Sequence, residues 1–289
     1  LKKAEAFFDQ APFILANCDF ITNIDLNPII RKHISRKAIA TMVLFEDQKR
    51  AGLYAQVGIN ESSRLCSVPR LETAPPARKG IFTGLHILSP QVFAYLEEKP
   101  CGINEVLYPR LLREFPNEVF GDFPGDEYWY DTGDLSSLHD TSMRLLDQLL
   151  GQPPQQPPGQ LPGKSLGQLP GQPPWQPLLS SKGTRQLLET SESHYKEWKK
   201  GIWIADGALV PQDTICQPPI LVGRGSVIGK RVRLGPHVVL GENVVVGDDA
   251  EIRRTVALSN AFAEKAGKFY EVILYGQSAI PAKQSSKKI

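Results

Sequence analysis

The pattern of apolar and polar residues differs between two regions of this chain. Over the first 150 residues, short apolar runs that suit buried strands alternate with amphipathic stretches that suit helices. The pattern predicts strands at 12–17, 38–45, 54–59 and 82–88, and helices at 25–32, 90–97, 105–114 and 136–150. Strands that alternate with helices in this way favour an α/β domain with a mostly parallel sheet.

In the last third of the chain, a six-residue period replaces the alternation of strand and helix patterns. Glycines recur every six residues from position 223 to position 247, and an aliphatic residue precedes each of them: Val222, Ile228, Leu234, Leu240 and Val246. Neither a helix nor an ordinary strand has this period, whereas a parallel β-helix built from hexapeptide repeats does. We expect the five aliphatic side chains to point into the coil. A helix at 184–200, carrying Tyr195 and Trp198, is expected to cap it.

Between the two regions lies a stretch in which GQPP and GQLPG units repeat, at residues 151–177. Proline removes backbone donors and glycine raises chain entropy, so this stretch is predicted to be a poorly ordered linker. The expected domains are therefore residues 1–150, a linker at 151–183, and residues 184–289 with the β-helix. The chain starts at Leu1, a few residues before the first strand, and we expect it to be an N-terminally truncated piece of a longer protein.

Composition excludes several classes of protein. The 33 basic and 31 acidic residues nearly balance and do not cluster, which disfavours nucleic-acid binding. No apolar run reaches the roughly 18 residues of a membrane helix. The four cysteines include no CxxC pair, and scattered thiols of this kind suit a cytoplasmic protein better than a disulfide framework or a zinc site.

Two carboxylates follow predicted strands. Asp19 comes directly after the strand at 12–17, in the run Asn17-Cys18-Asp19, and Asp131 follows the short aromatic run 128–130. Ligands of α/β sheets bind beyond the carboxyl ends of strands, and Mg²⁺ binds one or two carboxylates together with substrate phosphates. By itself each aspartate could equally be a turn or capping residue.

The segment GIFTGLHILSP, residues 80–90, joins a strand to a helix. A glycine within a strand, here Gly84, indicates a bulge or a close approach to a ligand. His86 has no acid or nucleophile spaced beside it, and we expect it to be structural.

Taken together and in this order, these segments resemble the sugar-nucleotide pyrophosphorylases, nucleotidyltransferases similar to mannose-1-phosphate guanylyltransferase. PFILANCDFITNIDL resembles the family's strand that ends in Asn-Gly-Asp, GIFTGLHILSP its FTG segment, and YWYDTGDLSSL its Trp-x-Asp-x-Gly-Thr-Pro segment. The resemblance implies a Rossmann-like nucleotidyltransferase sheet, incomplete in this chain, followed by a short left-handed parallel β-helix. The implied reaction transfers a nucleotidyl group from a nucleoside triphosphate to a sugar 1-phosphate and releases pyrophosphate.

The resemblance also implies roles for individual residues. Asp19 and Asp131 would be the catalytic aspartates that hold Mg²⁺, and we expect them to approach each other in space. Asn17, Thr83, Gly84 and Gly133 would bind substrate, with Gly84 leaving room for the hexose. The β-helix would support homo-oligomerisation.

Several departures from the family pattern stand out. Cys18 replaces a glycine, Asp134 stands where Thr-Pro is usual, and no Glu-Lys-Pro sugar-site segment is recognisable between Tyr54 and Gly80. Above all, no G-x-G-x-R phosphate loop occurs in the 289 residues. Such a loop binds a triphosphate through backbone N–H groups, so we expect the chain as given to be inactive. The alternative is a non-catalytic regulatory or scaffold protein with the same fold. A hexapeptide acyltransferase is disfavoured, because the repeats are few and His237 follows Pro236 at a turn.

Overall fold

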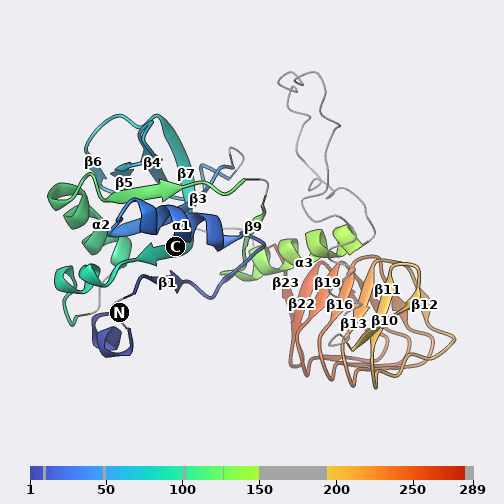
Figure 1. The fold of residues 1–289 in the computed structure, drawn as a ribbon. Helices are drawn as coiled ribbons and strands as arrows, with labels where there is room; N and C mark the ends of the chain where they lie inside the picture. The colour runs from blue at the N-terminus through green and yellow to red at the C-terminus, as the bar shows by residue number, and fades with distance from the viewer. Residues whose placement is uncertain (9–10, 48–49, 100–101, 126, 150–193, 284–289) are drawn as a thin grey trace, which may run out of the picture. The chain divides into compact units, whose positions relative to one another are not determined.

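The computed structural model describes residues 1–8, 11–47, 50–99, 102–125, 127–149 and 194–283 (Figure 1). The contacts divide the chain into two compact units, residues 1–130 and 131–289. The predicted linker at 151–183 lies outside the described residues, as does the first part of the predicted helix at 184–200. No helix within the described ranges is long and apolar enough to cross a membrane.

The first unit is built on a mixed sheet with the strand order β6-β5-β4-β7-β3-β8, to which β1 adds by pairing with β7. Its elements are η1 (Lys2–Phe7), β1 (Phe13–Ala16), β2 (Phe20–Thr22), α1 (Leu26–Ser35), β3 (Ala40–Phe45), β4 (Gln56–Ile59), β5 (Leu65–Val68), β6 (Leu71–Glu72), β7 (Arg78–Leu88), η2 (Pro90–Tyr95), α2 (Ile103–Glu114), β8 (Val119–Asp122) and β9 (Trp129–Asp131), the last of which ends in the second unit.

The strand directions correct the expectation of a mostly parallel sheet. Only β3 and β8 pair in parallel among the described strands of this sheet, whereas β1, β3 and β4 all run antiparallel to β7. Hydrophobic periodicity reports which residues are buried but not which way a strand runs, so β7 was indistinguishable from a parallel strand.

Helices cover both faces of this sheet (Figure 1). On one face, α1 packs against Val43, Leu85 and Ile87. On the other, α2 and η2 pack against the alternate residues of β3, such as Met42 and Leu44. Asp25, the first residue of the predicted helix at 25–32, is the N-cap of α1: its carboxylate accepts a hydrogen bond from the Asn27 N–H at 2.9 Å. The predicted helix after Ser89 is a short 3-10 helix, η2.

The strand predicted at 12–17 is less buried than expected. Its side chains alternate between half-buried and exposed, and Ile14 is 45% exposed. Phe13 and Leu15 face the core, where Phe13 stacks on Phe93 with ring centroids 5.4 Å apart. Strand β1 is thus covered on one face, because it lies at the edge of the sheet rather than between two layers.

The second unit is a parallel β-helix of about four turns, as the hexapeptide period predicts (Figure 1). Val222, Ile228, Leu234, Leu240 and Val246 are all at most 3% exposed and share one core. Ile220 pairs with Val238 and Val238 with Thr255, so that one turn takes 18 and then 17 residues.

Three stacks of parallel strands form the walls of this coil. The first contains β11 (Ile202–Ala205), β13 (Ile220–Val222), β16 (Val238–Leu240), β19 (Thr255–Ala257) and β22 (Val272–Tyr275). The second contains β12 (Ile215–Cys216), β15 (Arg233–Leu234), β18 (Glu251–Arg253) and β21 (Lys268–Tyr270). The third contains β14 (Val227–Ile228), β17 (Val245–Val246) and β20 (Phe262–Ala263).

The ends of the coil differ from the prediction. Residues 195–199, expected to be helical, form β10 (Tyr195–Lys199), which runs antiparallel to β11 at one end of the first stack. At the other end, β23 (Ser278–Pro281) runs antiparallel to β22. An edge strand that offers free backbone groups can override a weak local preference for helix.

Within the second unit, α3 (Leu135–Leu149) packs against the coil. Its side chains Met143 and Leu146 pack with Val256 and Ile273 on the outer surface of the first stack. The side chain of His139 bonds the carbonyl of Arg254 at 2.6 Å.

A buried polar pair adds to this packing of α3. The Nε2 atom of His237, which lies in a turn of the coil, is 2.6 Å from the Asp147 carboxylate on α3, and both side chains are almost fully buried.

Candidate functional site

Three segments that are far apart in the sequence converge on a bulge in β7. Between Phe82 and His86, β7 has three residues opposite the single residue Val43 of β3. Gly84 lies at the centre of this bulge with a φ of +87°, which an L side chain rarely adopts. A bulge at Gly84 is what the isolated glycine predicts, and the structure confirms it.

Hydrogen bonds hold both sides of the bulge. The Thr83 hydroxyl donates to the carbonyl of Val43 at 2.9 Å. The Asn17 N–H donates to the carbonyl of Gly84 at 3.0 Å, and the indole N–H of Trp129 donates to the carbonyl of Thr83 at 2.8 Å. The three sequence motifs therefore meet at one place in the first unit.

Space beside Gly84 is limited by Asn17. A Cβ atom added to Gly84 would lie 3.1 Å from the side chain of Asn17, which is tighter than ordinary van der Waals contact. Glycine is therefore required here for two reasons, its φ and its neighbour. The Asn17 side chain itself is exposed and lies beside the bulge.

Asp19 and Asp131 flank the small two-stranded sheet formed by β2 and β9. Asp19 is exposed and directly precedes β2, while Asp131 is the last residue of β9 and the first residue of the second unit. Its Oδ1 atom accepts a hydrogen bond from the Gly133 N–H at 2.8 Å, which fixes the turn after β9. Within the described ranges, no three His, Cys, Asp or Glu side chains cluster as a metal site.

Asp134, the departure from the family pattern, has a local structural role. Its carboxylate accepts a hydrogen bond from the Ser137 N–H at 2.8 Å, and its carbonyl accepts one from the Leu138 N–H at 2.9 Å. These bonds cap the first turn of α3. Cys18, the other departure, is exposed beside Asp19.

Sequence reasoning missed two residues behind the bulge. Trp129 is buried, and the Arg50 guanidinium lies 5.2 Å from its ring centroid and donates to its carbonyl at 3.0 Å. Arg50 also pairs with Asp47 at 2.7 Å. The sequence showed Trp129 only as part of the aromatic run 128–130, and nothing in it indicated that the Trp129 indole bonds Thr83 or that Arg50 covers the ring.

His86 is structural, as expected. Its Nδ1 atom lies 2.7 Å from the hydroxyl of Tyr108 on α2, and burial lowers the pKa of His86 to about 3. Burial also raises the pKa of Tyr108. At neutral pH both groups are uncharged and serve to join α2 to the sheet.

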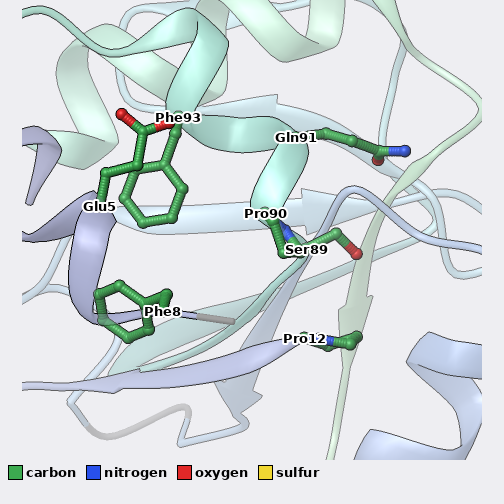
Figure 2. Close-up of a pocket in the computed structure, with 7 residues that line it drawn as sticks. All are labelled: Glu5, Phe8, Pro12, Ser89, Pro90, Gln91 and Phe93. Carbon is green, nitrogen blue, oxygen red and sulfur yellow. The ribbon is translucent and has the colours of Figure 1, made fainter. Parts of the chain in front are cut away.

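A depression in the surface of the first unit lies elsewhere. It has a volume of about 450 Å³ between η1 and η2, where Phe8, Phe93 and Glu5 lie on one side and Pro12 and Ser89 on the other (Figure 2). Pro12 precedes the amino end of β1, whereas Asn17 follows its carboxyl end. The depression is therefore separate from the bulge and contains none of the predicted site residues.

A comparison with family models bears on the first half of the chain. A family model described as nucleotidyl transferase matches residues 1–148. A search of curated proteins finds no match.

Similar solved structures include a protein assigned as a glucose-1-phosphate thymidylyltransferase from Bacillus anthracis, in complex with sucrose, at 19% identity and a TM-score of 0.38 over 47% of this chain and 55% of that one. HddC from Yersinia pseudotuberculosis matches at 17% identity and a TM-score of 0.38, over 48% and 57% of the two chains. The same protein complexed with GMP-PN matches at 18% and 0.38, over 47% and 56%. This chain spans little more than half the length of these structures.

Proposed function

Since the chain belongs to the nucleotidyl transferase family, we propose that the complete protein transfers a nucleotidyl group from a nucleoside triphosphate to a sugar 1-phosphate. The observation that carries this proposal is the meeting of Asn17, Gly84 and Trp129 at one bulge. These residues come from the three segments that resemble sugar-nucleotide pyrophosphorylases. The product would be a nucleoside-diphosphate sugar.

In the proposed reaction, a phosphate oxygen of the sugar 1-phosphate attacks the α-phosphorus of the triphosphate. The bond between the α-phosphorus and the oxygen that bridges to the β-phosphorus breaks, and pyrophosphate leaves. Little covalent chemistry falls to the protein, which positions the reactants and balances their charge. Gly84 would leave space for the sugar ring, and Asn17 would offer amide donors and an acceptor beside it.

Asp19 and Asp131 are the proposed ligands of Mg²⁺, and their chemistry fits this ion. Mg²⁺ binds through one or two carboxylates and completes its shell with water and phosphate oxygens, so a cluster of three protein ligands is not needed. When bound, Mg²⁺ neutralises charge on the triphosphate. The Asp131 carboxylate is oriented by the Gly133 N–H, which gives Gly133 a positioning role.

The test uses the full-length protein, Mg²⁺, a panel of nucleoside triphosphates and a panel of sugar 1-phosphates, with pyrophosphate release as the measurement. Asp19→Asn and Asp131→Asn should each lower turnover by roughly 100-fold or more, since each removes a charge from the metal site. Asp134→Asn is the matched control, because asparagine caps a helix as well as aspartate does. Equal turnover in all three variants would contradict the assignment.

We also expect residues 1–289 alone to release no pyrophosphate, because they contain no G-x-G-x-R loop to bind the triphosphate. Release above a no-protein control would show that another segment supplies the phosphate site. A full-length protein that turns over none of the substrates would favour the non-catalytic regulatory or scaffold protein instead. The free thiols of Cys18, Cys66 and Cys216 suit the proposed cytoplasmic location.

A further inference from the structure

The three walls of the β-helix have outer surfaces of different character. The first wall is covered in its centre by α3, whose side chains contact Leu221 and Val239. Along the second wall, Arg233 pairs in register with Glu251, and Glu251 with Lys268, so that this surface is charged. Among the described residues, no helix packs on the third wall, and its matching outward-facing positions carry no charged residues.

The outer surface of the third wall is instead a continuous apolar stripe. Leu209 pairs with Val227, Val227 with Val245, and Val245 with Phe262, one residue from each turn of the coil. They are 63%, 40%, 42% and 42% exposed. Turns of a β-helix are about 4.8 Å apart, so the stripe is about 14 Å long. Apolar side chains aligned at successive turns form a contiguous exposed apolar patch, and such patches often mark interaction sites.

Charged residues flank the stripe in the two middle turns, and their signs alternate. In the turns that precede the stripe, Arg224 and Glu242 occupy equivalent positions 18 residues apart. In the turns that follow it, Lys230 and Asp248 are equivalent in the same way. Each flank therefore has a positive charge at the second turn of the stripe and a negative charge at the third.

This pattern fits a second copy of the chain in one orientation. A twofold axis that lies in the interface, perpendicular to the coil, reverses the order of the turns but keeps each flank opposite the same flank. Arg224 then faces Glu242 of the partner subunit, and Lys230 faces Asp248 of the partner subunit. Within the stripe, Val227 meets the partner's Val245. A twofold axis parallel to the coil would instead place Arg224 against the partner's Lys230, two like charges.

The residues of the two outer turns are also compatible with the antiparallel arrangement. Leu209 would meet the partner's Phe262, the largest apolar residue of the stripe. The flanking residues equivalent to the charged ones are Asp206 and Ser259 on one side and Gln212 and Lys265 on the other. Neither of these pairs brings like charges together.

We propose that the stripe formed by Leu209, Val227, Val245 and Phe262 is an interface at which two copies of this chain associate with their coils antiparallel. Four side chains and their flanks bury much less than the roughly 800 Å² per partner of a standard interface, so the association through this surface alone is weak. The interface lies wholly within the β-helix and does not depend on the proposed reaction.

The experiment is sedimentation velocity on the chain at several concentrations up to about 200 µM, where a weak interface of this size becomes populated. The expected result is a shift from monomer towards dimer as the concentration rises. Val245→Lys should abolish the shift, because it places an ammonium group against an apolar partner residue. Ile215→Lys is the matched control, since Ile215 is also an exposed aliphatic residue but lies on the second wall, and it should leave the dimer unchanged. Circular dichroism should show the coil intact in both variants.

Reversing the charge of Arg224 or of Glu242 tests the orientation of the two coils in the dimer. Arg224→Glu and Glu242→Arg should each weaken the dimer at least several-fold, because each brings like charges together twice. An equimolar mixture of the two variants should associate again, since each glutamate then faces an arginine. A parallel dimer predicts the opposite for Arg224→Glu, which would relieve repulsion and strengthen association. The proposal is wrong if the chain stays monomeric throughout, if Val245→Lys dimerises as the parent does, or if Arg224→Glu strengthens the dimer.

Discussion

Two buried neutral histidines should make the stability of the first unit depend steeply on pH below 6.5. His33, on α1, lies between Thr41 on β3 and Ser89, with its Nδ1 2.9 Å from one hydroxyl and its Nε2 3.0 Å from the other. The Ser89 hydroxyl gives its proton to the carbonyl of Ala38, so Nε2 must donate to Ser89 and Nδ1 must accept from Thr41. Both ring nitrogens are therefore satisfied while the ring is neutral, and burial disfavours the cation.

The magnitude follows from the pKa values. Burial lowers the pKa of His33 to about 4 and that of His86 to about 3, from 6.5 for the exposed group. Because both folded pKa values are depressed, the unfolded chain binds more protons. Stability is complete above pH 6.5 and is lost as the pH falls towards each folded pKa. Between pH 7.5 and pH 5.0 each histidine costs about 2 kcal/mol, and the two together about 4 kcal/mol.

The assay compares urea unfolding of the first unit at pH 7.5 and pH 5.0. A brief deuterium pulse at one common pH, read by mass spectrometry on peptides from β3 and β7, reports the unfolded fraction of this unit. His33→Gln and His86→Gln remove the titrating ring but keep an amide that can hydrogen bond. Each should reduce the stability difference between the two pH values by about 2 kcal/mol, whatever it costs at neutral pH.

His194→Gln is the matched control, because His194 is exposed on the β-helix. It should leave the pH dependence of the first unit unchanged. If the two buried-site variants showed the same pH dependence as the parent chain, the argument that these rings are held neutral would be refuted.

Three further substitutions test individual contacts. Gly84→Ala should destabilise the first unit by about 1–2 kcal/mol and abolish turnover of the full-length protein, because of the positive φ and the close Asn17 side chain; urea unfolding and pyrophosphate release measure the two effects. Trp129→Phe removes the donor to the Thr83 carbonyl and should cost about 1–3 kcal/mol in urea unfolding, with an unchanged transition excluding the bond as a support of the bulge. His237→Leu takes the imidazole away from the buried Asp147 carboxylate and should cost the β-helix unit about 3 kcal/mol by thermal unfolding, whereas a neutral effect would show that α3 is held by its apolar contacts alone.

Local patterns determined a large part of this fold. The hexapeptide period specifies the β-helix, because each of the three walls must bury one aliphatic residue in every turn, and all five predicted positions are buried. Asp25 marks the start of α1 because a cap bonds a backbone group only two residues away. Gly84 signals a bulge because the positive φ of that position is readily adopted by glycine and rarely by other residues. The motifs also sufficed to identify the family.

Tertiary contacts decided the rest. The residues of β10 became a strand because they form a hairpin with β11, and β11 is held at the end of the first stack by its parallel pairing with β13, which lies further along the chain. An apolar helix at 136–150 was predictable, but its packing against Val256 and Ile273 was not, since an amphipathic face indicates burial without naming the surface that buries it. The bond from Trp129 to Thr83 spans 46 positions. It exists because the strands set the two groups side by side, a relation that no local pattern in the sequence encodes.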